Sequence, residues 1–417
     1  MQQQFATCIA DMNSVMDSYR AAGIKPYIVT LGDMTRESRW YYPGYEYHLR
    51  DYANTIKGFN APIFNATGNH DLDVRDTGEF GPKQAWKDII GPTYYSFNLG
   101  KAHYVVLDNT ITTNGEGIYV AGQYAMGIPD DQFEWLEKDL ATVADKTAPL
   151  FIVMHCPLYS RPGVNNAATL GIYMIAGHGQ KLIDCLNVGF PNVIMVSGHT
   201  HPNSRYSPPA YPWLTTKHIA AMSGNLFLTG QPGWAGNHIA ICGSPGGYQV
   251  YELDGKNIQW YFKGIGYDRN YQFRTYDRNQ IHITREKYAP NATNQTLINN
   301  IPAWANPYHT PSSDNDVIII VWGWETSWNI QVLEGSVPLN VERISTKDPL
   351  SIISSDMMAI NNNRTMINDP MTTSASHFFR VRANSPTSTL HIKVTDRFGK
   401  VYEETMTRPK ELTVNSK

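Results

Sequence analysis

The 417-residue sequence has little that points to a membrane, a nucleic acid or a disulfide framework. No run of about 18 apolar residues occurs, so a membrane-spanning helix is not expected. Lys and Arg number 34 against 37 Asp and Glu, which gives no electrostatic reason to expect a nucleic acid partner. The four cysteines lack the paired spacing of a zinc site and are expected to be ordinary core thiols. A nucleophile-elbow motif is also absent, which excludes the usual serine hydrolases.

What the sequence does contain favours two packed domains. A length of 417 residues exceeds one ordinary core, and a hydrophobic content of 42% is ample for two. The first residues show no basic segment followed by an apolar run, so no signal peptide is expected. Instead, apolar residues recur there at steps of three and four, which predicts an amphipathic helix on Phe5, Ile9, Met12, Met16 and Tyr19.

Short strands and helices alternate through the first part of the chain. Helices are expected at 45–59, 129–143 and 180–188. Strands are expected in the apolar segments PYIVTLGD (26–33), PIFNATGNHD (62–71), GPTYYSFNLGKAHYVVLDN (91–109), PLFIVMHCP (149–157) and NVIMVSGHTH (192–201). This alternation predicts a layered α/β domain over residues 1–270, with its site where the strands of the sheet end.

The later part of the chain is rich in β-strand patterns. Residues 248–264 are expected to form a hairpin around Asp254 and Gly255. Residues 271–310 show no clear period and are expected to be a linker. Beyond them, turn-punctuated strand patterns at 316–325, 377–383, 389–396 and 400–406 predict a second, smaller β-sandwich-like domain at 311–417.

Side chains able to bind a metal follow four of the predicted strands. Each has a bland explanation by itself, because an aspartate often forms a turn and a histidine often packs in a core. Together at the ends of neighbouring strands they favour a shared cation, because buried polar groups must be paired or ligated. The mixed oxygen and nitrogen set suits Mn, Fe, Zn or Mg. The candidates are Asp33, Asn69, His70, Asp71, His155, His199 and His201.

The order of these motifs resembles a known family. Gly32-Asp33, then GNHD at 68–71, an apolar strand ending in His155, and GHTH at 198–201 are similar to the calcineurin-like metallophosphoesterases, over residues 1–265. The tail, with WGWE (322–325), KDPL (347–350) and the strands from 377 to 409, resembles the C-terminal β-domain of a bacterial branch of that family.

The resemblance implies roles for the candidate residues. In that family two metals share a bridging carboxylate, which would be Asp33. Asn69, His155 and His199 would complete one metal site, and His201 would belong to the other. The remaining motif residues would act on the substrate, His70 by contacting phosphate and assisting the leaving group and Asp71 by orienting it. Near these motifs, Arg36 and Arg205 could bind phosphate oxygens, although for either one a solvated surface arginine is the simpler explanation.

One part of the family pattern is missing. The pattern begins with a strand that ends in an aspartate and, two positions later, a histidine or a similar ligand, whereas this chain opens on the helix that should follow that strand. The sequence therefore holds one complete metal site and a remnant of the second. Two explanations stay open: an N-terminally shortened chain, or a natural variant that uses one metal or none. Shortening is our preferred hypothesis, because loss of the first strand exposes a sheet edge.

The expected function is metal-dependent hydrolysis of a phosphomonoester or phosphodiester by metal-activated water, weakened by the missing motif. The phosphoester could be a small molecule or part of a macromolecule. The alternative is a catalytically impaired protein that binds a ligand or partner on the same fold. Export to the periplasm or secretion is expected from the resemblance alone, because bacterial relatives are often exported.

Overall fold

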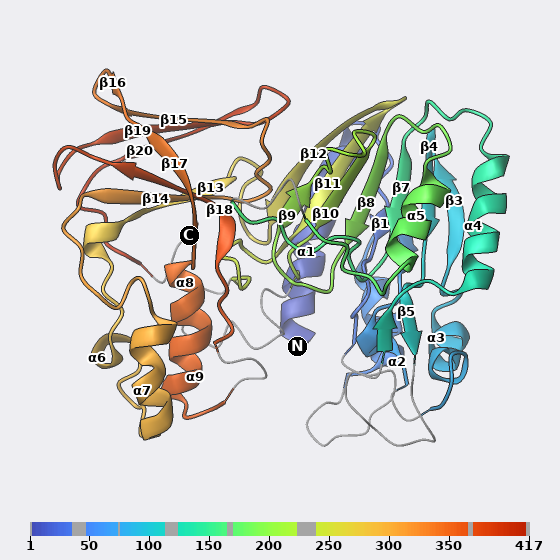
Figure 1. The fold of residues 1–417 in the computed structure, drawn as a ribbon, viewed down its shortest axis with the longest axis horizontal. Coiled ribbons are helices and arrows are strands. Elements are labelled where there is room, and N and C mark those ends of the chain that lie inside the picture. Colours follow the sequence, from blue (N-terminus) through green and yellow to red (C-terminus); the bar gives the residue numbers. More distant parts are fainter. Residues whose placement is uncertain are drawn as a thin grey trace.

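The protein is described here by a computed structural model, which covers residues 2–35, 47–73, 76–112, 124–164, 170–222, 239–365 and 370–413. Two units lie side by side (Figure 1). The first is a layered α/β unit that contains the strands up to β12, and the second contains the strands from β13 to β20. A mixed α/β fold with a separate β-rich C-terminal region confirms the fold class predicted from the sequence.

A six-stranded sheet forms the centre of the first unit. Its inner strands β4, β7, β8 and β10 are parallel, and β3 and β9 pair antiparallel at the two edges. The strand order is β3 (Tyr95–Leu99), β4 (Ala102–Val106), β7 (Leu150–Val153), β8 (Val193–Ser197), β10 (Leu214–His218) and β9 (Ser204–Tyr206). Because the inner strands run in parallel, their carboxyl ends meet at one edge of the sheet.

Helices cover one face of this sheet. In α4 (Asp130–Thr142), Phe133, Leu136 and Leu140 are buried at helical spacing, as the sequence predicted. The second covering helix is α5 (His178–Leu186), which buries Leu182 and Leu186 in the same cluster. Together with the layer on the opposite face, these helices bury β7 and β8 on both sides, which explains why these two strands are nearly continuous hydrophobic runs.

The opposite face packs against two separate pairs of strands. One is the parallel pair β1 (Ile28–Val29) and β2 (Ile63–Phe64), and the other is the hairpin β11 (Gly247–Asp254) and β12 (Asn257–Gly264). Helix α1 (Gln2–Ala21) lies beside this hairpin, where Asp11 forms an ion pair with Lys263 at 2.9 Å and accepts a hydrogen bond from Tyr248 at 2.8 Å. The predicted helix and the predicted hairpin are both confirmed.

Smaller elements connect these layers. They are α2 (Leu49–Thr55), η1 (Ile56–Gly58), η2 (Asn69–Asp71), η3 (Gly81–Lys83), α3 (Gln84–Ile89), β5 (Thr110–Thr112) and β6 (Tyr124–Met126). Within the described residues, no helix is both long and apolar enough to cross a membrane.

The second unit is a sandwich of two four-stranded antiparallel sheets. One has the order β13 (Phe273–Asp277), β14 (Asp316–Val321), β18 (Ala375–Arg382), β17 (Val341–Thr346); the other has the order β16 (Val337–Pro338), β15 (Asn329–Glu334), β19 (Leu390–Thr395), β20 (Val401–Met406). Strand β14 is buried on both faces. Ile319 lies in the core between the sheets, whereas Ile318 and Ile320 lie in a core on the other face, where helices pack.

The prediction that residues 271–310 form a linker is wrong, because this segment is folded. This segment contains β13, η5 (Arg278–Gln280), α6 (Arg285–Tyr288) and α7 (Gln295–Trp304). Leu297, Ile301 and Trp304 of α7 are buried beside α8 (Pro349–Ser351), the π-helical η6 (Ile352–Met357) and α9 (Met358–Asn361). Polar residues obscured the helical periodicity of this segment in the sequence, and some of them cap its helices. Asn294, for example, accepts hydrogen bonds from two backbone amides of α7.

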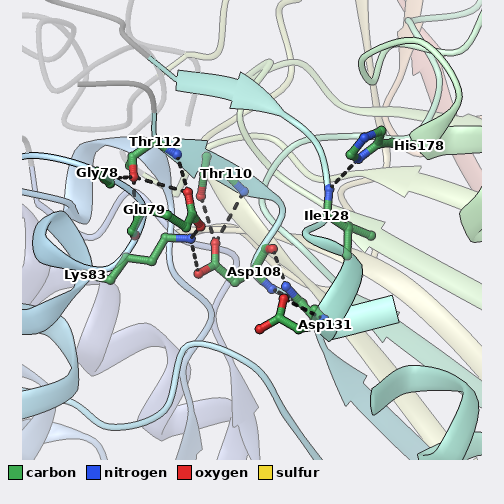
Figure 2. A network of polar contacts seen from close by, with 10 residues as sticks. Gly78, Glu79, Lys83, Asp108, Thr110, Thr112, Ile128, Asp131 and His178 are labelled. Carbon is green, nitrogen blue, oxygen red and sulfur yellow. Dashed lines mark hydrogen bonds and ion pairs between the residues drawn. The ribbon is translucent and has the colours of Figure 1, made fainter. Parts of the chain in front are cut away.

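A buried ion pair fixes the start of α3 to the central sheet (Figure 2). Lys83 Nζ lies 2.8 Å from Asp108 Oδ2, and the two side chains are 4% and 2% exposed. Glu79 is a second carboxylate partner of Lys83, and Asp108 also accepts a hydrogen bond from Thr110. Burial by itself would lower the pKa of Lys83, but the charge of Asp108 raises it above its ordinary value, so the lysine stays charged.

Replacing Lys83 with alanine should strongly destabilise the fold. Lys83→Ala leaves the carboxylate of Asp108 buried without its cation, which costs about 3–5 kcal/mol in comparable buried pairs. Denaturant unfolding should show this loss. The matched control is Lys181→Ala, which removes an exposed pair with Asp130 (2.6 Å) and should leave the unfolding midpoint nearly unchanged. Equal losses in the two variants would contradict the assignment.

Candidate metal centre

Four loops that follow strands bring the predicted ligands to one place. β1 and β2 are parallel neighbours, and the chain after them carries Asp33 and Asn69. β7 and β8 are parallel neighbours in the six-stranded sheet, and the chain after them carries His155 and His199. The site therefore lies where the carboxyl ends of two packed sheets meet, as the alternation of elements predicted.

The donor atoms of these four residues converge. Asn69 Oδ1 lies 3.1 Å from both His155 Nε2 and His199 Nδ1, and the two ring nitrogens are 3.2 Å apart. Asp33 Oδ2 is 3.1 Å from His155 Nε2. A carboxylate oxygen, an amide oxygen and two imidazole nitrogens thus face a common point.

The hydrogen bonds of His155 indicate which charge is favoured at the centre of this cluster. His155 Nδ1 lies 2.7 Å from the carbonyl oxygen of Leu31, which only accepts, so Nδ1 carries the proton. A neutral His155 then presents a bare Nε2 to the oxygens of Asp33 and Asn69. Burial works against charging this ring, but Asp33 outweighs burial and raises the pKa of His155 above its ordinary value. A positive charge at the centre, either a proton or a metal ion, is therefore favoured, and the donor set fits a divalent metal.

The ligand loops have strained backbones. Asp33, His199 and His201 adopt positive φ values of 55°, 61° and 66°. Among the described residues, only two other non-glycine residues, Asn315 and Asn363, do so. A left-handed conformation costs an L-residue roughly 1–2 kcal/mol, and such strain persists where surrounding contacts enforce it, often at functional sites. The concentration of strain on three predicted ligands indicates that their geometry is imposed.

Two glycines allow the ligand loops to approach each other. A Cβ atom on Gly68 would lie 2.3 Å from both the backbone nitrogen and Oδ1 of Asp33. Gly32 has a φ of +85°, and its Cβ would lie 2.7 Å from Nδ1 of His155. Neither position has room for a side chain, which explains the glycine in each motif.

Asp71 joins two of these loops. Its Oδ2 accepts a hydrogen bond from the backbone of Gly68 at 2.9 Å, and its Oδ1 accepts from the backbone and hydroxyl of Thr35 at 2.9 and 3.1 Å. Burial, with the nearby charge of Asp33, raises the pKa of Asp71 to about 7. These contacts make Asp71 a brace of the ligand loops, and its orienting role toward His70 stays a prediction.

His70 is placed differently from the buried ligands. Its backbone N–H donates to Asp33 Oδ1 at 2.9 Å, and the residue is exposed. The backbone that carries the exposed imidazole of His70 is therefore fixed to the carboxylate of Asp33.

The other two imidazoles are suited to bind a metal at neutral pH. Burial, with the nearby charge of His155, lowers the pKa of His199 to about 3. Burial also lowers the pKa of His201, which is close enough to feel the charges of Asp33 and His155. Both rings are therefore neutral near pH 7, the form in which histidine ligates metals.

Two residues near the centre were not predicted from the sequence. Tyr124 Oη lies 3.4 Å from His199 Nε2, on the side of the ring away from Asn69. The thiol of Cys156, expected to be an ordinary core thiol, lies within 4.8 Å of donor nitrogens of His155 and His199. Burial raises the pKa of Cys156 well above its ordinary value, so the thiol is protonated. Neither residue belongs to a motif with a recognisable spacing.

The two predicted phosphate-binding arginines have different outcomes. Arg36 lies outside the described residues. Arg205 is buried at the boundary between the two units, where its Nε lies 3.3 Å from Glu325 Oε2 and its Cζ is 4.0 Å from the centre of the Trp260 ring. These contacts give Arg205 a structural role, and the structure lends no support to its predicted contact with substrate.

Comparison with known proteins places this site in context. Residues 7–203 match the family model described as calcineurin-like phosphoesterase, and residues 218–402 match the model of the C-terminal domain of calcineurin-like phosphoesterase. Purple acid phosphatase 15 and Fe(3+)-Zn(2+) purple acid phosphatase 12, both from Arabidopsis thaliana, are 25% and 26% identical over 174 and 167 residues. The matches cover 40% and 36% of this chain.

The two plant phosphatases match a smaller part of this chain than the two family models do together. The aligned region spans only 29% and 32% of the length of the two plant phosphatases. A solved structure of a dimetal phosphatase from Danio rerio is 14% identical, with a TM-score of 0.34 over 51% of this chain and 77% of that chain. The predicted bacterial branch stays a prediction. The two family-model matches together span the metal centre and most of the second unit, and they show that this chain belongs to the calcineurin-like phosphoesterase family.

Proposed function

We propose that this chain is a metal-dependent phosphohydrolase that cleaves a phosphomonoester or phosphodiester at the centre described above. The convergence of Asn69 Oδ1, His155 Nε2 and His199 Nδ1 within 3.2 Å of one another, with Asp33 beside them, carries the proposal. The carboxylate of Asp33, the amide oxygen of Asn69 and the unprotonated Nε2 of His155 face the same point as acceptors, and one divalent ion would satisfy them together.

The ligand set divides into one full position and part of another. Asp33, Asn69, His155 and His199 would hold one ion, and Asp33 with His201 would contribute to a second. A bound divalent ion supplies Lewis acidity, which lowers the pKa of water toward neutrality and stabilises charge on phosphoryl oxygens. Because only Asp33 carries a negative charge in this set, the loaded site keeps a positive charge that attracts a phosphate.

The protein's own groups position the metal ligands and supply a proton to the leaving group. Leu31 fixes the tautomer of His155, and Asp71 ties the Gly68 loop to the Thr35 loop. We assign proton donation to the departing alkoxide to His70, because it is exposed and an imidazole donates protons efficiently near pH 7.

A second candidate function is binding without hydrolysis. The small number of ligands for a second metal ion favours this function, since among the described residues only Asp33 and His201 are proposed to bind that ion. An assay of nitrophenyl phosphate and bis-nitrophenyl phosphate with Mn, Fe, Zn and Mg separates the two functions. Hydrolysis with metal supports the enzyme, whereas stoichiometric metal without turnover of either ester supports the binding protein.

Removing a ligand should abolish metal binding without unfolding the protein. His155→Ala and Asn69→Ala each delete one donor, and we expect metal affinity to fall by more than about 100-fold, which exceeds the usual effect of changing a residue that only hydrogen-bonds to a ligand. Calorimetric titration with Mn or Zn measures the affinity, and circular dichroism checks the fold. His391→Ala, at an exposed histidine of β19, is the control and should bind as the wild type does. Full retention of metal in both ligand variants would remove these residues from the site.

Metal affinity should fall as the pH falls. Asp33 raises the pKa of His155, so below that raised pKa a proton occupies the Nε2 that the metal needs. One competing proton weakens binding by about tenfold per pH unit in that range. His199, with its pKa lowered to about 3, adds no second proton above pH 5. Affinities measured between pH 5 and 8 that do not change would contradict this competition.

Loss of His70 should depend on the leaving group. His70→Ala removes the proposed acid, so turnover of an alkyl phosphate should fall by about 10²–10⁴-fold. Nitrophenyl phosphate needs little protonation of its leaving group and should be affected far less. Metal affinity serves as the control and should be unchanged. An equal loss on both substrates would show that His70 contributes to binding instead of proton transfer.

A further inference from the structure

Exposed apolar side chains gather in one short segment just before α5. Of the ten large apolar side chains that are exposed among the described residues, three lie within four consecutive positions: Ile172, Tyr173 and Ile175. The others are distributed over both units. A single exposed apolar residue needs no explanation, but a group of them often marks a place where a ligand or a partner binds.

This segment lies beside the metal centre. The ring of Tyr173 is centred 6.5 Å from the imidazole of His199 and is tilted by 50° to it. The ring of Tyr124 is centred 6.0 Å from the same imidazole and stands nearly perpendicular to it, at 89°. Tyr124 is partly buried, whereas 38% of Tyr173 is exposed. Of the two rings next to this proposed ligand, Tyr173 is therefore the one that is open to contact with a bound molecule.

Backbone hydrogen bonds fix the position of the Tyr173 ring. The N–H of Tyr173 donates to the carbonyl oxygen of Leu158 at 2.7 Å, and the N–H of Ile175 donates to that of Met126 at 2.8 Å. Leu158 lies three residues after the proposed ligand His155, and Met126 is the last residue of β6. Because the exposed segment is tied to chain that also builds the metal centre, its apolar surface needs little reorganisation before a ligand binds.

The position of this surface favours a small molecule that is held by its phosphate over a protein partner. Three side chains that are each 36–39% exposed offer far less area than the about 800 Å² that each partner buries in a stable protein interface. A phosphate at the metal centre would fix one end of its own ester, so that only the alcohol group needs further contacts. Aromatic groups pack favourably on a tyrosine ring in offset or edge-to-face arrangements.

We propose that the ring of Tyr173 binds the alcohol group of the substrate and gives the site a preference for phosphoesters of aromatic alcohols. This rests on the proposed function, because the metal centre must hold the phosphate. Tyr173 would act on specificity alone, since its ring contacts the alcohol group and not the reacting phosphoryl group. Ile172 and Ile175 flank it in the sequence and add exposed apolar surface.

Two phosphonates test this preference without turnover, because a phosphorus–carbon bond replaces the ester that the site would cleave. In calorimetric titrations of the protein at saturating metal, phenylphosphonate should bind at least about tenfold more tightly than methylphosphonate, since a ring buries more apolar area than a methyl group. Tyr173→Ala should weaken the binding of phenylphosphonate by about 3–10-fold and leave that of methylphosphonate unchanged. Tyr173→Phe keeps the ring and should bind both compounds as the wild type does.

The matched control is Tyr27→Ala, which should leave both affinities unchanged. Tyr27 is 41% exposed and directly precedes β1, whereas the metal centre lies beyond the carboxyl end of that strand. Equal affinity of the wild type for the two phosphonates, or an equal loss of both in Tyr173→Ala, would overturn the proposal and leave the proposed function intact. Binding of neither phosphonate to the metal-loaded protein would overturn the proposed function as well.

Discussion

The hydrogen bond from His155 Nδ1 to the carbonyl of Leu31 is the contact on which the metal centre depends. It commits the only proton of the neutral ring, so Nε2 faces the oxygen atoms of Asp33 and Asn69 without a proton of its own. A positive charge at Nε2, either a proton or a metal ion, offsets this crowding of oxygen acceptors. The same bond joins β7 of one sheet to the loop after β1 of the other, so it also fixes how the two sheets meet.

The backbone around this contact is specialised for close approach. Gly68 lets the Asn69 loop touch Asp33, and positive φ values at Asp33, His199 and His201 turn their side chains out of the strand direction. Strain of this kind is held by packing elsewhere, here by the buried central strands and by Asp71. The site is therefore built before any ion arrives, which reduces the reorganisation that binding requires.

Two buried lysines show opposite solutions to the same electrostatic problem. Lys83 lies between Asp108 and Glu79 and keeps its charge. Lys217 lies opposite Arg205 and forms no ion pair with a carboxylate of the described residues, and burial lowers its pKa to about 7. A fold that tolerates the second case must supply a compensating group or accept a neutral amine, and this makes the boundary between the units a distinct chemical environment.

The sequence by itself determined the ligand types, their order and the strands that carry them, because apolar runs ending in Gly-Asp, Asn-His or His are local patterns. It also determined the helices α1 and α4 and the final β-sandwich, whose periodicities are strong. It could not show that residues 271–310 are folded, since α6 and α7 are short and the core that buries their apolar residues also includes β14 and residues 350–360, which are distant in the sequence. Only the tertiary structure decided that Arg205 pairs with Glu325, that Tyr124 contacts His199 and that Lys217 lies opposite Arg205. These facts depend on which residues far apart in sequence share a face, and no local pattern encodes that.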